Sequence, residues 1–197
     1  MEKNTQNMTA RDAMPSSPQW ARTLARGTVW AGAVCLLGVL GACSVLNQGP
    51  APHASRTDDW TILPIANNTE TPQAGLRAAS IAEGLLSAEG FAHIKRYPAS
   101  ADDETLFDPA KSDIQQKALE WARGEHIRYA LTGSVNEWRY KVGVDGEPAV
   151  GMTLQLIDVP SGNVIWSGTG SRTGWSRDAL SGVAQQLERQ LLSPLMR

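Results

Sequence analysis

Residues 150–169 read VGMTLQLIDVPSGNVIWSGT, and this stretch decides the fold because it predicts two strands joined by a tight turn. Residues 150–159 and 164–169 are rich in residues that favour β-structure. The intervening Pro160-Ser161-Gly162-Asn163 has the composition of a turn. The two predicted strands therefore pair antiparallel.

Upstream of this hairpin, residues 129–142 predict a further strand. Residues 143–148 contain Asp145-Gly146, a pair that accepts positive φ and favours a hairpin turn. The second half of the chain therefore predicts an antiparallel meander of three strands.

The first half of the domain alternates strands with helices. Short strands are predicted at residues 60–65 and 91–97, and apolar residues at helical spacing predict helices over 73–89, from about 112, and over 177–192. The predicted order is β-α-β-α-β-β-β-α. Helical crossovers usually join parallel strands, so we expect a mixed α/β sheet with helices packed against it.

An export signal precedes this domain. An apolar run over residues 29–40 follows Arg22 and Arg26, and it ends in Leu40-Gly41-Ala42-Cys43, which resembles the lipobox of a bacterial lipoprotein. A plain transmembrane anchor with an incidental cysteine is the alternative, but the run is short for a bilayer core of about 30 Å. We expect a signal peptide at 1–42, a lipidated tether at 43–57 and a single domain at 58–197.

Composition narrows the function classes. Loss of residues 1–42 removes four basic and two acidic residues, which leaves a net charge of −4. Nucleic-acid binding is therefore not expected, because it needs a basic surface. The two cysteines are Cys35, in the signal, and Cys43, the proposed lipid site, so the folded part has no disulfide available.

Catalytic motifs are missing from the sequence. It contains no Gly-x-Ser-x-Gly, HExxH, P-loop or GxGxxG pattern, and His53, His93 and His126 are isolated from one another. Carboxylates are plentiful, so a glycosidase pair stays open, although nothing singles out two of them. We expect no enzyme activity, no cofactor and no metal site.

Three segments carry a family resemblance. Residues 60–72, WTILPIANNTETP, resemble the opening strand and loop of the PelC family of Pel exopolysaccharide export lipoproteins. Residues 129–138 and 156–168 are similar to its third strand and last hairpin, which also recur in curli-secretion lipoproteins and penicillin-binding-protein activator lipoproteins. The resemblance covers residues 58–195.

The resemblance implies a fold and a role. The fold is a three-layer α/β sandwich like the amino-terminal domain of TolB. The role is a lipid-anchored periplasmic ring of identical subunits that guides a cationic, partly deacetylated polysaccharide towards an outer-membrane β-barrel. The lipoprotein resemblance implies that an Asp directly after the lipidated cysteine favours the inner membrane. Ser44 holds that position in this chain and favours the outer membrane.

A binding module that activates a cell-wall synthase, or serves a secretion channel, is the alternative function. An activator would have to reach across the periplasm. Residues 44–56, fully extended at about 3.4 Å per residue, reach only about 45 Å. The activator function is therefore disfavoured.

Two sets of residues are candidates for the export role. Asp102, Asp103, Asp145 and Glu147 form the densest acidic sites outside helices and would face a cationic polymer; each of them taken singly is also typical of a solvated turn. Trp175, with Arg172 and Arg177 around it, lies in a predicted loop and would face the membrane, because tryptophan is enriched at membrane–water interfaces. The alternative is that Trp175 caps the core.

Overall fold

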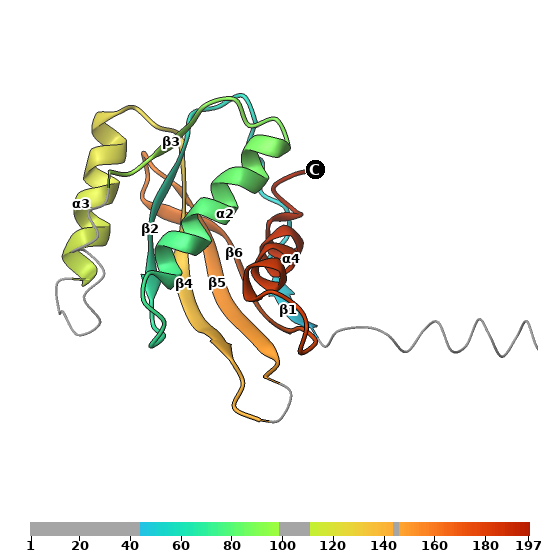
Figure 1. Cartoon of the computed structure of the whole chain (residues 1–197). Coiled ribbons are helices and arrows are strands. Elements are labelled where there is room, and N and C mark those ends of the chain that lie inside the picture. Colours follow the sequence, from blue (N-terminus) through green and yellow to red (C-terminus); the bar gives the residue numbers. More distant parts are fainter. Residues whose placement is uncertain (1–43, 99–110, 144–145) are drawn as a thin grey trace, which may run out of the picture. The chain divides into compact units, whose positions relative to one another are not determined.

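A computed structural model describes residues 44–98, 111–143 and 146–197, which all belong to one compact unit, residues 42–197 (Figure 1). The chain forms β1 (Ser44–Gln48), β2 (Trp60–Asn67), α2 (Ala74–Ala88), β3 (Ile94–Arg96), α3 (Lys111–Gly124), β4 (Tyr129–Tyr140), β5 (Pro148–Asp158), β6 (Asn163–Thr173) and α4 (Leu180–Leu192).

The strands form one mixed six-stranded sheet in the order β1-β6-β5-β4-β2-β3. β2 is parallel to β3 and to β4, as expected for strands joined through helices. β4, β5, β6 and β1 pair antiparallel. The predicted meander is confirmed, and it occupies the centre of the sheet.

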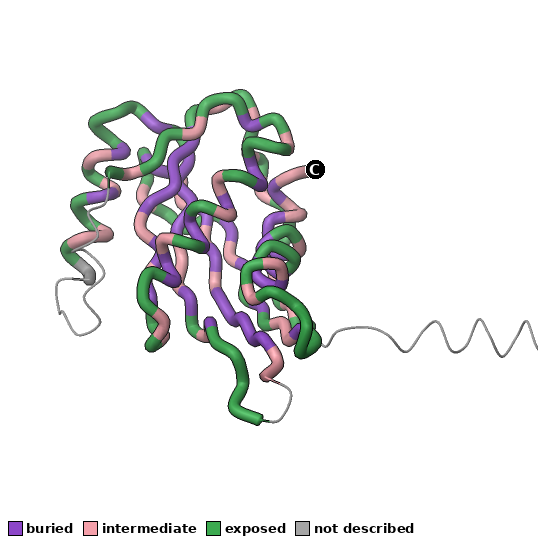
Figure 2. The backbone as a smooth tube through the Cα atoms, in the orientation of Figure 1, coloured by how far each residue is buried: buried purple, intermediate pink, exposed green. Residues whose placement is uncertain are grey.

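Helices cover both faces of the sheet, which confirms the three-layer α/β sandwich (Figure 1). Ile62 of β2 packs in the large core beneath α2 and α4, whereas its neighbour Leu63 packs with Ala118 and Ala122 of α3. Adjacent residues of a strand point to opposite faces, so these two clusters lie on opposite sides. Buried residues follow the central strands, while residues 141–143, which come directly after β4, are exposed (Figure 2).

Residues 44–48 correct one expectation, because they form the edge strand β1 and not part of a loose tether. β1 pairs antiparallel with the outer edge of β6, starting with Ser44 opposite Arg172. An edge strand is held largely by backbone hydrogen bonds and needs few apolar side chains, so the polar composition of residues 44–56 concealed it. The sheet therefore begins at Ser44, ahead of the predicted boundary at residue 58.

The segment between β1 and β2 also lies on the domain. The indole nitrogen of Trp60 donates a hydrogen bond to the carbonyl of Ser55 at 2.8 Å, and the hydroxyl of Tyr129 donates to the carbonyl of His53 at 3.2 Å. These contacts hold the segment on the domain, so it does not supply the length of free chain that a long-reaching activator would need.

Pro64 lies inside the strand β2, at an irregularity in its pairing with β4. Proline has no N–H for the ladder, and the register between β2 and β4 shifts next to it, between Ile62 and Ile65. The Pro64 carbonyl accepts hydrogen bonds from the hydroxyl of Thr132 at 2.8 Å and from the side-chain amide of Gln115 at 2.7 Å. α3 is thereby fixed to the sheet by a polar contact as well as by its apolar side.

The predicted apolar stripe of the last helix is confirmed: Val183, Ala184, Leu187 and Leu191 are buried. Glu188 is buried among them, with 0% exposure, and neither carboxylate oxygen has a hydrogen-bond partner in the part of the chain that the structure describes. Burial away from water raises the pKa of the Glu188 carboxyl well above its ordinary value. An unpaired carboxyl in this position lowers stability at neutral pH.

We expect Glu188→Met to raise the free energy of unfolding at neutral pH by roughly 1–4 kcal/mol. The native state holds the Glu188 proton more tightly than the unfolded chain does, so wild-type stability falls as the pH rises from the ordinary pKa of 4.5 through the raised native pKa. The advantage of Met therefore grows over the same interval. Urea unfolding at several pH values measures it.

Glu188→Gln is the control, because it keeps the shape and polarity of the side chain but does not titrate. We expect the stability of Glu188→Gln to lack the pH dependence that Glu188 gives the wild type. We also expect Glu188→Gln to stay less stable than Glu188→Met, because it still buries a polar group. An advantage of Met that is the same in acid and at neutral pH would contradict the assignment.

Candidate functional site

The start of β1 fixes where the proposed lipid site joins the sheet. Ser44, opposite Arg172 near the end of β6, follows Cys43 directly in the chain. Successive Cα atoms are about 3.8 Å apart, so a lipid on Cys43 would leave the chain at this edge of the sheet. We call this side of the domain the anchor end.

The loop after β6 lies at the anchor end. Trp175 is 59% exposed, so this indole does not cap the core. Its backbone N–H donates to the Asp178 carboxylate at 2.8 Å, and the Asp178 N–H donates to the Trp175 carbonyl at 2.9 Å. This turn precedes α4, which begins at Leu180, three residues after the predicted start at residue 177, with Ala179 at the N-cap.

The two basic residues near Trp175 differ in environment. Arg177 is exposed. Arg172 is half-buried, and its Nε atom is enclosed without a hydrogen-bond partner among the described residues. Arg177 therefore has the freer guanidinium for contact with phosphate.

The connection between β4 and β5 reaches the same end. Tyr140 pairs with Pro148, and the backbone N–H of Lys141 donates to the Glu147 carbonyl at 2.7 Å. Glu147 is half-buried there. The structure thus brings Glu147 to the same end as Arg172, Trp175 and Arg177.

The remaining acidic candidates, Asp102, Asp103 and Asp145, lie outside the described residues. Their proposed contact with a polymer stays a prediction.

Sequence reasoning missed an open groove of about 930 Å³ on the sheet face opposite α2 and α4. Residues 68–72, 136–139, 151–152 and 169–171 line it, together with Val45 and Asn47 of β1. The lining combines apolar surface with hydroxyl and amide side chains and with three charged residues, Glu70, Glu137 and Arg139. Glu137 forms an ion pair with Arg139 at 3.1 Å. Of the elements that the structure describes, only α3 packs on this face, and it covers the other end.

One wall of the groove is the Asn-Asn-Thr-Glu-Thr-Pro segment that carries the family resemblance. The Asn67 side chain is buried and uses both ends of its amide, donating to the Thr71 carbonyl at 2.8 Å and accepting from the Thr69 N–H at 3.0 Å. The Thr71 hydroxyl donates to the Trp138 carbonyl. This motif therefore builds a fixed loop along the groove.

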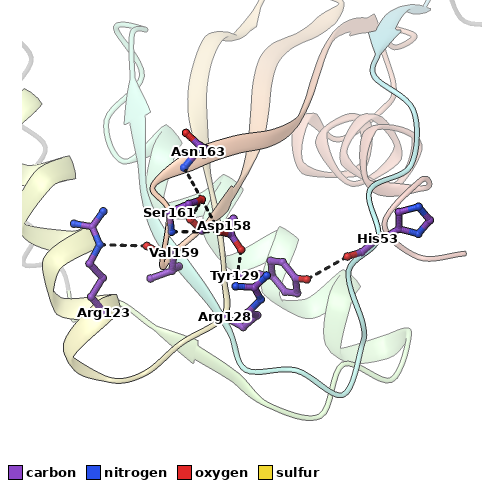
Figure 3. Close-up of polar contacts among 8 residues, drawn as sticks. All are labelled: His53, Arg123, Arg128, Tyr129, Asp158, Val159, Ser161 and Asn163. Atoms are coloured by element: carbon purple, nitrogen blue, oxygen red, sulfur yellow. Dashed lines mark hydrogen bonds and ion pairs between the residues drawn. The ribbon is translucent and has the colours of Figure 1, made fainter.

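Asp158 lies in the hairpin of residues 156–168, another segment with the family resemblance, and its carboxylate stabilises the turn (Figure 3). One Asp158 carboxylate oxygen lies 2.7 Å from the Arg128 guanidinium, and the other accepts from the hydroxyl and the backbone N–H of Ser161. The hydrogen bond from the Ser161 hydroxyl is the main reason why the pKa of Asp158 is lowered. The motif closes the turn between β5 and β6, at the end of the sheet away from the anchor.

Two other kinds of feature are absent from the described ranges. No three His, Cys, Asp or Glu residues gather there as a metal site. In the same ranges, none of the helices has the length and apolar character to cross a bilayer.

Comparison with known proteins identifies the family. No protein-family model and no curated protein sequence matches the chain. Among solved structures, the PelC dodecamer from Paraburkholderia phytofirmans is 48% identical, with a TM-score of 0.67 over 78% of this chain and 98% of that chain. A methionine variant of that dodecamer matches at 48% identity and a TM-score of 0.67, over 77% of this chain and 97% of that one. With nearly half of the residues identical across almost the whole relative, this chain belongs to the PelC family.

Proposed function

We propose that the protein is a lipid-anchored subunit of the Pel exopolysaccharide export machinery, held through Cys43 on the periplasmic face of the outer membrane. Membership of the PelC family supports the export role. The observation that carries the anchoring is the register of β1: Ser44 pairs with Arg172, three residues before the exposed Trp175. A lipid on Cys43 would hold this end of the sheet against the bilayer.

We assign the groove face of the sheet to contact between copies of the chain in a ring. The solved PelC relatives are dodecamers. A closed ring joins two different patches on each subunit, and a partly uncovered sheet face can serve as one of them. Val45 is 71% exposed on this face, next to hydroxyl and amide groups that can form hydrogen bonds across an interface.

We assign the polymer path to the carboxylates of Asp145 and Glu147, with Asp102 and Asp103 as further candidates. One carboxylate repeated in every subunit makes a belt of negative charge, which attracts a cationic, partly deacetylated amino-sugar polymer. The place of Glu147 at the anchor end supports this path, because a polymer would leave the ring there towards a β-barrel exporter in the outer membrane.

The variant Asp145→Asn combined with Glu147→Gln should reduce Pel export strongly while leaving thermal stability nearly unchanged, because both residues come between the end of β4 and the start of β5 in the sequence and both substitutions keep the size of the side chain. Polymer secreted by cells that carry the variant is the measurement. Glu120→Gln on the outer side of α3 is the matched control, since the Glu120 side chain bonds the neighbouring Gln116 at 3.1 Å on the helix surface. Normal export from the double variant would remove the pair from the polymer path.

Trp175→Ala should change the free energy of unfolding by less than about 0.5 kcal/mol, because the indole is 59% exposed. We expect it to impair export and the position of the domain at the membrane, because the variant lacks the indole that would lie at the membrane–water interface. Trp138→Ala provides the contrast: Trp138 is 2% exposed and its loss should cost about 3–5 kcal/mol. A loss of similar size for Trp175→Ala would place the indole in the core.

A further inference from the structure

Large apolar side chains on the surface concentrate at the anchor end. The described residues expose six of them: Val45, Tyr140, Val142, Val164, Ile165 and Trp175. Val164 and Ile165 follow the turn between β5 and β6, at the far end of the sheet. The other four lie around the start of β1, the connection between β4 and β5, and the loop after β6. Val142 is 101% exposed, so none of the described residues covers it.

The β4–β5 connection extends past the level of Ser44. Ser44 pairs with Arg172, which pairs with Val150. Tyr140 pairs with Pro148, which comes two residues before Val150 in β5. Pro148 therefore lies beyond the level of Ser44, on the side from which the chain enters β1. At about 3.3 Å per residue, the end of β4 lies roughly 7 Å beyond Ser44, and Val142 follows it.

This projecting segment is fixed to the Trp175 loop. The Tyr140 hydroxyl accepts a hydrogen bond from the N–H of Leu180 at 3.2 Å, and the Lys141 ammonium donates to the Thr173 hydroxyl at 3.0 Å. The Gly174 N–H donates to the Pro148 carbonyl at 2.9 Å. The two segments therefore present one surface.

We propose that residues Tyr140–Val142 insert with Trp175 into the headgroup layer of the membrane that holds the lipid anchor. This inference rests on the proposed function, because it takes Cys43 as the anchor. A wholly exposed aliphatic side chain, two exposed aromatic side chains and the cationic Lys141 and Arg177 are the chemistry of a membrane–water interface. The surface is continuous with the anchor, so a lipid surface is its partner.

The test uses the full-length lipidated protein in vesicles of phosphatidylethanolamine and phosphatidylglycerol. Beyond Cys43, which the lipid blocks, the mature chain has no cysteine, so Val142→Cys supplies a unique thiol for an environment-sensitive dye. Trp175→Cys carries the same dye as a report on the proposed membrane seat. Val164→Cys is the matched control, because Val164 is a valine that is 50% exposed at the far end.

Spin-labelled lipids with shallow labels should quench the dye at residues 142 and 175 several-fold more than at residue 164. Quenching at 175 with residue 142 no different from 164 would overturn the inference and leave the proposed function standing. Equal, weak quenching at all three positions would overturn both. Quenching at 142 without quenching at 175 would support the hairpin contact and remove Trp175 from the proposed seat. Protection of the dye at 142 that persists in the detergent-solubilised assembly would assign the segment to a second copy and overturn the lipid contact.

Discussion

Cys43→Ser is expected to release the protein from the membrane fraction while leaving its fold intact. Cys43 precedes β1, so the side chain takes no part in the pairing between Ser44 and Arg172. Acyl chains on the cysteine would hold the domain at the bilayer, since two or more lipid signals give stable anchoring and one gives only marginal binding. Without them, we expect the exposed surface around Trp175 not to retain the protein at the membrane by itself.

Fractionation at high salt and circular dichroism of the released protein measure the two halves of this expectation. Cys35→Ser is the matched control, because Cys35 lies in the expected signal peptide and its loss should leave the mature protein anchored. Retention of Cys43→Ser in the outer-membrane fraction would mean that lipidation is not what attaches the protein.

Gly133→Ala is expected to lower the free energy of unfolding by roughly 3 kcal/mol. A Cβ at Gly133 would lie 2.0 Å from the Thr153 carbonyl oxygen and 3.1 Å from the Leu154 Cα, and both are backbone atoms of the paired strand β5. Relief of that clash requires the centre of the β4–β5 pair to separate. The glycine of the resembling strand is therefore a packing requirement.

Urea unfolding measures this loss, and Gly84→Ala is its matched control. Gly84 lies in α2, and a methyl group added there would meet nothing within 4 Å, so the same substitution should stabilise the protein by about 0.5–1 kcal/mol. A neutral Gly133→Ala would show that β4 and β5 can shift apart at little cost.

The elements predicted well from the sequence are those with local signals. The strands of the meander were predicted because turn residues separate runs of β-formers, and Asp158 with Ser161 then closes one of those turns. The last helix was predicted from its apolar spacing. Its start was predicted three residues too early, at residue 177, because the side chain of Asp178 bonds the backbone of Trp175 in a turn that precedes Ala179.

The features that were missed depend on partners distant in the sequence. β1 is a strand because β6 offers it an edge, and nothing in the residues 44–48 themselves required this. The groove combines β1 with loop 68–72 and three central strands, so no single stretch of the sequence predicts it. Glu188 interrupts no helical pattern, and its burial follows from the packing of α4.

The mass of the lipid-free domain, residues 44–197, tests the central claim most directly. Sedimentation or native mass spectrometry should find a single defined ring-sized assembly, a dodecamer if the ring matches its PelC relatives. Ser171→Arg, on an exposed groove residue, should give a folded monomer if the groove face joins the subunits. A wild-type domain that stays monomeric at high concentration would contradict the assignment of a ring-forming export subunit.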